Sequence, residues 1–257
     1  MKNVLIVGYG IVGNNLSHEL KNLKPDIYDK YKPEVNTKRD IKYDITFICV
    51  DTPLTKDKTL DISEVKNALK ENDSDIYVIK STCPIGTIDM LKKESKKRIV
   101  FCPEYYGATQ HANNFNYDYT VLGGNKKDCI DVIQTLQYCY DGRHQFRITS
   151  SKSAELSKFM INSFLATKVS FCNQFYKLCK KYNLSYEELR EIFTLDDRIN
   201  NSHTFVYDDQ PYWDSHCLNK DVSYTAYTEN AELLKSICKF NDKQKKQFNN
   251  KKNKEQN

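Results

Sequence analysis

The feature that most constrains this chain is a glycine-rich turn at residues 8–13, with the sequence GYGIVG. It follows a short β-branched run at residues 3–7 and precedes apolar residues at helical spacing, the context of a dinucleotide-binding turn. Gly8 would permit the tight turn, Gly10 would let the backbone approach a pyrophosphate, and Gly13 would let helix and strand pack closely. The turn therefore predicts a strand and a helix that together bind a dinucleotide.

The residues that would hold the rest of the dinucleotide can also be predicted. Ile11 and Val12 would open the helix, and their backbone N–H groups would face the phosphates. Asp29 lies about 20 residues after the first glycine, where an acid binds the ribose hydroxyls. An acid there favours NAD over NADP because it would repel a 2′-phosphate, although Lys30 and Lys32 weaken this preference. Asp29 could also be only a turn residue.

Further runs with the composition of buried strands alternate with helical segments through residues 1–150. This alternation predicts an α/β fold with a doubly wound, Rossmann-type parallel sheet and right-handed crossovers. Ligands bind beyond the carboxyl ends of such strands, so Thr52, Thr82 and Glu104, which follow strands, are expected to line that edge. Each could equally be an ordinary turn residue. The predicted strands after the first are residues 26–28, 43–50, 76–79, 99–102, 119–122 and 146–148.

The second half predicts an all-helical central domain over residues 151–239. Residues 153–182 contain no Gly or Pro and carry apolar residues at helical spacing, so we expect one helix of about 45 Å. A helix of that length can form an interdomain spine and a subunit contact, which favours a homodimer. Lys158 and Asn162 are four residues apart and would share one helix face, although such a pair is usually solvated.

Composition limits the remaining possibilities. Nine cysteines without a Cys-x-x-Cys pair favour reduced thiols in the cytoplasm over disulfides or a structural metal. The net charge of +5 lies mostly in residues 240–257, which hold six lysines against Asp242 and Glu255. We expect this segment to be a disordered basic tail without specific affinity for nucleic acid. No apolar run is long enough to cross a bilayer, and the first residues fit a buried strand better than a signal peptide.

The segment at residues 213–221 places a thiol, an ammonium and a carboxylate within five positions. Lys220 can favour the thiolate of Cys217, the species that attacks a carbonyl, and Asp221 could hold Lys220 or position a water. Alternatively, Cys217 could be a buried, unreactive thiol, as most cysteines are.

Taken in order, these and further motifs across residues 1 to about 230 resemble the UDP-glucose/GDP-mannose dehydrogenase family. Such enzymes use NAD to oxidise the C6 alcohol of a nucleotide sugar to the acid. The motifs that carry the resemblance are GYGIVG at 8–13, FICVDTP at 47–53, STCPIGT at 81–87, Pro103-Glu104, AELSK at 154–158, NSFLATK at 162–168, Asp197-Arg198-Ile199 and CLNKD at 217–221.

The resemblance implies a role for each matching residue and, for the product, a place in UDP-glucuronate and polysaccharide biosynthesis. Cys217 would form a thiohemiacetal and then a thioester with the substrate, and the oxyanion would be stabilised by Lys158 and Asn162. The implied catalytic residues are Cys217, Lys158, Asn162, Asp221, Glu104 and Thr82. The implied NAD-binding residues are Gly8, Gly10, Ile11, Val12, Gly13, Asp29, Thr52 and Thr82. The implied substrate-binding residues are Glu104, Tyr105, Tyr106, Lys158, Asn162, Arg198 and Lys220, with Arg198 reaching across a dimer.

Three departures from the family pattern leave alternatives open. The family has a third domain that binds the substrate nucleotide, so we expect those contacts to be missing here. The family's Gly-Phe-Gly-Gly run before the cysteine is replaced by residues 212–215, YWDS, which predicts either strain or another loop shape. Ala108 replaces a glutamate, and Asn200 replaces a glycine. The chain could therefore be a degenerate relative that binds NAD and nucleotide sugar with little turnover, or an oxidoreductase of the wider 6-phosphogluconate dehydrogenase type without a cysteine nucleophile.

Overall fold

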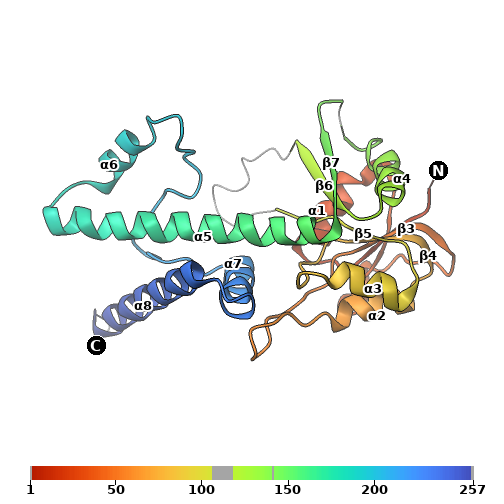
Figure 1. The fold of residues 1–257 in the computed structure, drawn as a ribbon, viewed down its shortest axis with the longest axis horizontal. Helices are drawn as coiled ribbons and strands as arrows, with labels where there is room; N and C mark the ends of the chain where they lie inside the picture. Colours follow the sequence, from red (N-terminus) through yellow and green to blue (C-terminus); the bar gives the residue numbers. More distant parts are fainter. Residues whose placement is uncertain (1, 106–117, 141, 256–257) are drawn as a thin grey trace. The chain divides into compact units, whose positions relative to one another are not determined.

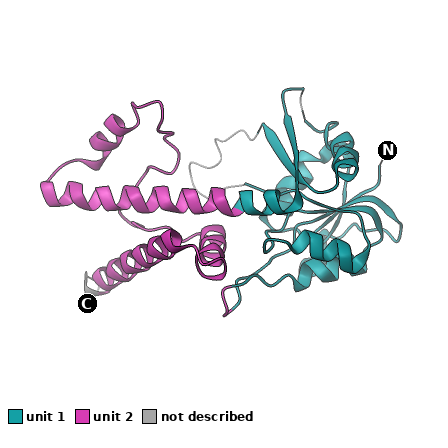
Figure 2. Cartoon of the chain, viewed as in Figure 1, with its two compact units in different colours: residues 1–55, 59–158 teal, residues 56–58, 159–257 magenta. Residues whose placement is uncertain are grey.

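The computed structural model of the chain describes residues 2–105, 118–140 and 142–255 and divides into two compact units. Unit 1 comprises residues 1–55 and 59–158, and unit 2 comprises residues 56–58 and 159–257 (Figure 2). The division falls within one long helix, α5 (Ser151–Tyr182), whose first two turns belong to unit 1.

Unit 1 is built on a seven-stranded sheet (Figure 1). Neighbouring strands are parallel except for β5 and β6, which are antiparallel, so the expected Rossmann-type fold is confirmed with a mostly parallel sheet. Helix–strand alternation along a sequence does not by itself give the direction of every strand pair, and an antiparallel pair is also compatible with it. In spatial order the strands are β2 (Asp26–Tyr28), β1 (Val4–Val7), β3 (Tyr43–Ile48), β4 (Ser74–Ile79), β5 (Ile99–Phe101), β6 (Tyr119–Gly123) and β7 (Gln145–Thr149).

Helices cover both faces of the sheet, as the doubly wound fold requires. Successive residues of a strand point to opposite faces, so Val4 and Ile6 enter one core cluster while Leu5 and Val7 enter the other. The first cluster includes residues of α1 and α4, and the second includes residues of α2 and α3. These helices are α1 (Ile11–Glu19), α2 (Ser63–Glu71), α3 (Thr87–Ser95) and α4 (Lys126–Leu136), with short 3₁₀ helices at η1 (Lys21–Leu23) and η2 (Pro33–Val35).

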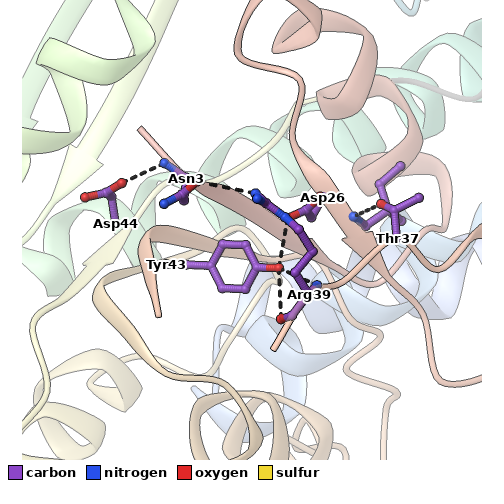
Figure 3. Close-up of polar contacts among 7 residues, drawn as sticks. Asn3, Asp26, Thr37, Arg39, Tyr43 and Asp44 are labelled. Carbon is purple, nitrogen blue, oxygen red and sulfur yellow. Dashed lines mark hydrogen bonds and ion pairs between the residues drawn. The ribbon is translucent and has the colours of Figure 1, made fainter. Parts of the chain in front are cut away.

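A polar network connects the amino ends of β1, β2 and β3 (Figure 3). Asp26, the first residue of β2, accepts from the Arg39 guanidinium at 2.8 Å and from the Tyr43 hydroxyl at 2.9 Å. The Asp44 carboxylate accepts from the backbone N–H of Asn3 at 2.6 Å. These contacts fix the register of the three strands at the edge opposite the one where ligands bind such sheets.

Unit 2 is helical. Its core combines α5 with the C-terminal helices, and its buried members include Ala166, Trp213 and Val222. After α5 come α6 (Tyr186–Phe193), α7 (His216–Ser223), the π-helical turn η4 (Tyr224–Thr228) and α8 (Glu232–Glu255). The predicted long helix is thus confirmed.

The predicted disordered tail over residues 240–257 is wrong for residues 240–255, which continue α8. Composition suggested solvation, but Cys238, Asn241 and Gln244 recur every three residues and are 3–4% exposed, so one side of the helix is packed. Lysine and glutamine are also good helix formers, which favours extension of the helix beyond its packed part. No helix within the described ranges is both long and apolar enough to span a membrane.

Candidate active site

The glycine-rich turn between β1 and α1 has the geometry that the sequence predicts. Gly8 has a φ of +92°, and a Cβ there would lie 2.7 Å from the carbonyl oxygen of Cys49. A Cβ at Gly13 would lie 1.9 Å from the carbonyl oxygen of Gly8, so glycine is needed for α1 to approach β1 this closely. At Gly10 an added Cβ would meet none of the described atoms within 4 Å. The turn therefore leaves open space at the start of α1.

The first amides of α1 and the carboxylate of Asp29 complete a candidate dinucleotide site. Ile11 and Val12 open α1, where backbone N–H groups have no partner within the helix. Asp29, directly after β2, accepts from the N–H groups of Tyr9 at 2.6 Å and Tyr31 at 2.8 Å. A carboxylate offers about four acceptor positions, so capacity for ribose hydroxyls remains. The open space, the helix start and this fixed acid together fit NAD.

Thr52 and Thr82 meet at the carboxyl ends of β3 and β4. The buried hydroxyl of Thr52 donates to the backbone carbonyl oxygen of Thr82 at 2.7 Å. Nearby, the hydroxyl of Ser81 donates to the carbonyl oxygen of Val50 at 2.6 Å. These bonds tie the two strand ends together and hold the segment that carries Thr82.

Glu155, which the sequence analysis did not single out as a site residue, fixes the other end of that segment. Its two carboxylate oxygens accept from the backbone N–H groups of Gly86 at 2.6 Å and Ile88 at 2.8 Å, at the start of α3. Burial raises the pKa of Glu155, and the two N–H bonds oppose this shift. The contact joins the start of α5 to the segment after β4.

Glu104 forms an ion pair with Lys80, a second residue that the sequence analysis missed. Lys80 follows β4 directly, and its side chain is 4% exposed, while that of Glu104, after β5, is 16% exposed. The Lys80 Nζ also lies 3.5 Å from the Cys102 sulfur. The sequence did contain a signal for Lys80. It is a lysine that directly follows a buried strand, at the same sheet edge as Glu104.

Tyr105 and Lys158 lie together within unit 1. The Lys158 ammonium is 5.3 Å from the centre of the Tyr105 ring, within range of a cation–π contact. Burial raises the pKa of Tyr105 to about 12, so its hydroxyl stays protonated at neutral pH. Tyr106 and Ala108 lie outside the described residues.

In unit 2 the structure joins two predicted site residues from distant parts of the sequence. The Asn162 side-chain amide, on α5, donates to the Asp221 carboxylate, on α7, at 2.6 Å, and both residues are buried. Cys217 is exposed and lies about one helical turn before Asp221 on α7. Lys158 is one turn before Asn162 on α5, which confirms that they share a helix face.

Cys217 lies in the first turn of α7, which Ser215 caps by accepting from the N–H of Leu218 at 3.2 Å. The N-terminus of a helix favours negatively charged groups beside it. Lys220 is on the same helix and half-buried. Because Cys217 is exposed, the alternative that it is a buried thiol is wrong.

The glycine-free loop before Cys217 is held by side chains of α8. Asn241 accepts from the Trp213 backbone N–H and donates to its carbonyl oxygen, both at 2.9 Å. The Asp214 carboxylate accepts from Lys245 and from Asn219, both at 2.7 Å, and these contacts lower its pKa. None of residues 212–215 has a positive φ among the described positions, so the loop takes another shape rather than a strained one.

Among the described residues, Arg198 forms no hydrogen bond or ion pair with another predicted site residue. Its side chain is 87% exposed and pairs with Asp196 two residues earlier. Asn200 accepts from Lys168 through its carbonyl oxygen at 2.8 Å. Within residues 2–105, 118–140 and 142–255, no three His, Cys, Asp or Glu side chains are grouped as a metal site.

Comparison with known proteins identifies related sequences over most of the chain. Residues 16–141 match the NAD binding domain of the UDP-glucose/GDP-mannose dehydrogenase family, and residues 152–243 match its central domain. The first match starts after the glycine-rich turn, so the assignment of that turn depends on its own sequence and geometry.

Among curated proteins, the chain is 26% identical over 257 residues to the UDP-glucose 6-dehydrogenase of Rickettsia prowazekii, covering 93% of this chain and 57% of that protein. It is 32% identical over 172 residues to the UDP-glucose 6-dehydrogenase TuaD of Bacillus subtilis, covering 61% of this chain and 36% of that protein. The chain thus spans less than two thirds of either relative.

Solved structures show the same fold. A UDP-glucose dehydrogenase from Pyrobaculum islandicum superposes with a TM-score of 0.75 at 19% identity, covering 94% of this chain and 68% of that one. The UDP-D-ManNAc dehydrogenase of Pyrococcus horikoshii gives a TM-score of 0.76 at 21% identity, covering 93% and 68%. A mostly parallel sheet followed by a helical region is therefore common to all three.

Proposed function

The chain belongs to the UDP-glucose/GDP-mannose dehydrogenase family, and we propose that it oxidises the C6 alcohol of a nucleotide sugar to a carboxylate with NAD. UDP-glucose is the proposed substrate and UDP-glucuronate the product, because the curated relatives described above are UDP-glucose 6-dehydrogenases. The cytoplasm is the proposed location, since all nine cysteines, including the proposed nucleophile, are free thiols.

The proposed chemistry has a covalent stage on Cys217. NAD, when bound, supplies the hydride acceptor for both oxidations. The first oxidation converts the alcohol to an aldehyde, and the Cys217 sulfur adds to the aldehyde carbon to give a thiohemiacetal. The second oxidation converts this adduct to a thioester. Water then adds to the thioester carbon, the carbon–sulfur bond breaks, and the carboxylate is released.

The other predicted residues have roles suited to these steps. We propose that the Lys158 ammonium and the Asn162 amide stabilise the oxyanion, for which removal of one donor typically costs about 3 kcal/mol of barrier. The proposed residues for positioning or deprotonating water are Thr82, Glu104 and Asp221. The proposed substrate contacts are Tyr105, Tyr106, Arg198 and Lys220.

The hydrogen bond between Asn162 and Asp221 is the observation that best supports this proposal. Both side chains are buried, which is costly for an amide and a carboxylate unless they are paired. The pair fixes the orientation of the Asn162 amide close to the turn of α7 that carries the exposed Cys217. A core without function would more simply hold apolar side chains at these positions.

A stripe of exposed apolar side chains on α5 supports a homodimer as the working form. Met160, Phe164 and Phe171 are 73%, 62% and 49% exposed, and Tyr182 at the end of the helix is 64% exposed. Their spacing of four, seven and eleven residues places them along one side of the helix. Apolar patches of this kind mark interaction sites, and the proposed occupant is the same helix of a second copy.

A second candidate function is binding of NAD and nucleotide sugar without efficient turnover. The glycine-free loop at residues 212–215 favours it, because this loop directly precedes the proposed nucleophile. The two candidates make opposite predictions for product formation.

The deciding experiment follows NADH after rapid mixing with NAD and a panel of UDP- and GDP-sugars. We expect two NADH per sugar from the wild type and no acid product from Cys217→Ser. The matched control is Cys139→Ser, which removes a half-buried thiol on unit 1 and should keep both oxidations. Measurable NAD binding with no NADH from any sugar would establish the second candidate instead.

A further inference from the structure

Lys80 is a buried cation at the carboxyl edge of the sheet that none of the proposed steps uses. Its backbone N–H donates to the carbonyl oxygen of Ile48 at 2.9 Å, which anchors it where β3 and β4 end. Its ammonium lies 3.5 Å from the Cys102 sulfur and pairs with the carboxylate of Glu104, both after β5. Lys80 therefore connects the ends of three adjacent strands, β3 through its backbone and β5 through its side chain.

The pairing with Glu104 satisfies the charge of this ammonium. A buried ammonium is strongly unfavourable without a compensating anion. The thiol of Cys49 is a neighbour, but burial raises its pKa to about 12 against the opposing effect of Lys80, so it is neutral at pH 7. The anion that the structure supplies is the carboxylate of Glu104.

The ion pair also limits where the Glu104 carboxylate can lie. Glu104 is in the connection after β5, and a glutamate side chain in a connection has several rotamers of similar energy. Lys80 is itself fixed, because its side chain is 4% exposed and its backbone is bonded to β3. One ammonium occupies only part of a carboxylate's acceptor capacity, so Glu104 can still accept from a water.

We infer that Lys80 is a positioning residue for hydrolysis of the thioester, acting through Glu104. This inference rests on the proposed function. In the step concerned, a water oxygen bonds to the thioester carbon, and one water proton passes to the Glu104 carboxylate. The carbon–sulfur bond then breaks, Cys217 leaves as a thiolate, and the acid product releases its own proton. The two oxidations that precede this step do not require Glu104.

The test compares Lys80→Met, Glu104→Gln and the double variant with the wild type by rapid mixing and intact-protein mass. Lys80→Met keeps the apolar stem and removes the charge. We expect its initial NADH formation to stay within about threefold of the wild type, while steady-state turnover falls roughly 100-fold. A covalent sugar adduct on the enzyme should accumulate, as in Glu104→Gln, and the double variant should be no slower than the slower single variant.

The matched control is Lys66→Met, which removes a half-exposed lysine paired with Glu94 on the same unit and should leave both phases unchanged. Equal loss of both NADH phases in folded Lys80→Met, or steady-state loss without an adduct, would overturn the inference. If Lys80→Met does not fold, the double variant removes both charges and must show the Glu104→Gln kinetics. A wild type inactive with every sugar would instead overturn the proposed function and this inference together.

Discussion

Two loops of this protein precede helices whose first residues belong to a proposed site. The backbone conformations of these two loops are stabilised in opposite ways. In unit 1 the turn before α1 contains three glycines, and two of them are required because a Cβ would collide with the backbone. In unit 2 the loop before α7 contains no glycine, and side chains from α8 hold its backbone and its carboxylate. The first loop depends on the absence of Cβ atoms at its own glycines. The second depends on hydrogen bonds from side chains of α8, a helix distant in the sequence.

This difference determines where each loop is vulnerable. The turn before α1 should fail when atoms are added to it, since its constraint is steric. The loop before α7 should fail when its partners on α8 are removed, since its constraint is a set of hydrogen bonds. Four variants test this distinction, and they are ordered by expected effect.

Gly13→Ala should have the largest effect. The new methyl would lie 1.9 Å from the Gly8 carbonyl oxygen, so α1 or β1 must shift. We expect the free energy of unfolding to fall by about 3 kcal/mol, measured by urea denaturation, and NAD binding to be lost. The matched variant Gly10→Ala has space for its methyl, so its stability should stay within about 0.5 kcal/mol of wild type while its NAD affinity falls. If Gly13→Ala and Gly10→Ala had equal unfolding free energies, the steric explanation of the turn would be wrong.

Asn241→Ala tests the loop before α7. It leaves the buried N–H and carbonyl groups of Trp213 without the side chain that satisfies both. We expect a loss of about 2 kcal/mol in unfolding free energy and a changed rate of Cys217 alkylation by iodoacetamide. Asn249→Ala, at an exposed position of the same helix, should change neither. An unchanged alkylation rate in folded Asn241→Ala would mean that α8 does not hold this loop.

Asp214→Gly makes the second loop resemble the first, because it introduces a glycine and removes a carboxylate that α8 holds. The carboxylate bonds to Lys245 and Asn219 are lost, and glycine gains freedom in the unfolded chain. We expect destabilisation of about 1 kcal/mol by the same denaturation assay. A gain in stability would show that glycine is the better residue at this position and that the α8 contacts only compensate for its absence.

The pH dependence of Lys245→Met should give the smallest effect. The hydrogen bond from Lys245, followed by that from Asn219, lowers the pKa of Asp214. A lowered carboxyl pKa stabilises the fold above the unfolded value of about 4, and this contribution is lost as pH falls through the folded value. Because both side chains are partly exposed, we expect about 0.5 kcal/mol between wild type and variant at pH 7, shrinking at pH 3. Lys246→Met, at an exposed position, is the control, and a difference that grows with acidity would contradict the assignment.

The sequence was informative wherever a structure depends on neighbouring residues. The strand before Gly8, the helix that begins at Ile11 and the long helix α5 follow from local periodicity and from backbone sterics, which depend on a few adjacent residues. For the same reason, the positions of Thr82 and Glu104 after strands could be anticipated, and so could the shared helix face of Lys158 and Asn162.

Sequence patterns led to a wrong prediction, or to none, wherever a structure depends on a contact with residues far away in the chain. The packed side of α8 involves Asn241 and Gln244, which composition alone counts as solvated residues. The antiparallel pairing of β5 with β6 also lay outside what helix–strand alternation can predict.

Local sequence thus determined the nucleotide-binding turn, most strands and the long helix, because φ/ψ restrictions and apolar spacing act between residues close in the chain. Only the tertiary structure decided that Lys80 pairs with Glu104, that Asn162 bonds to Asp221 59 positions later, and that α8 shapes the loop before Cys217. Each of these contacts requires a buried polar group to find its partner, and the topology of the chain sets which partner is within reach.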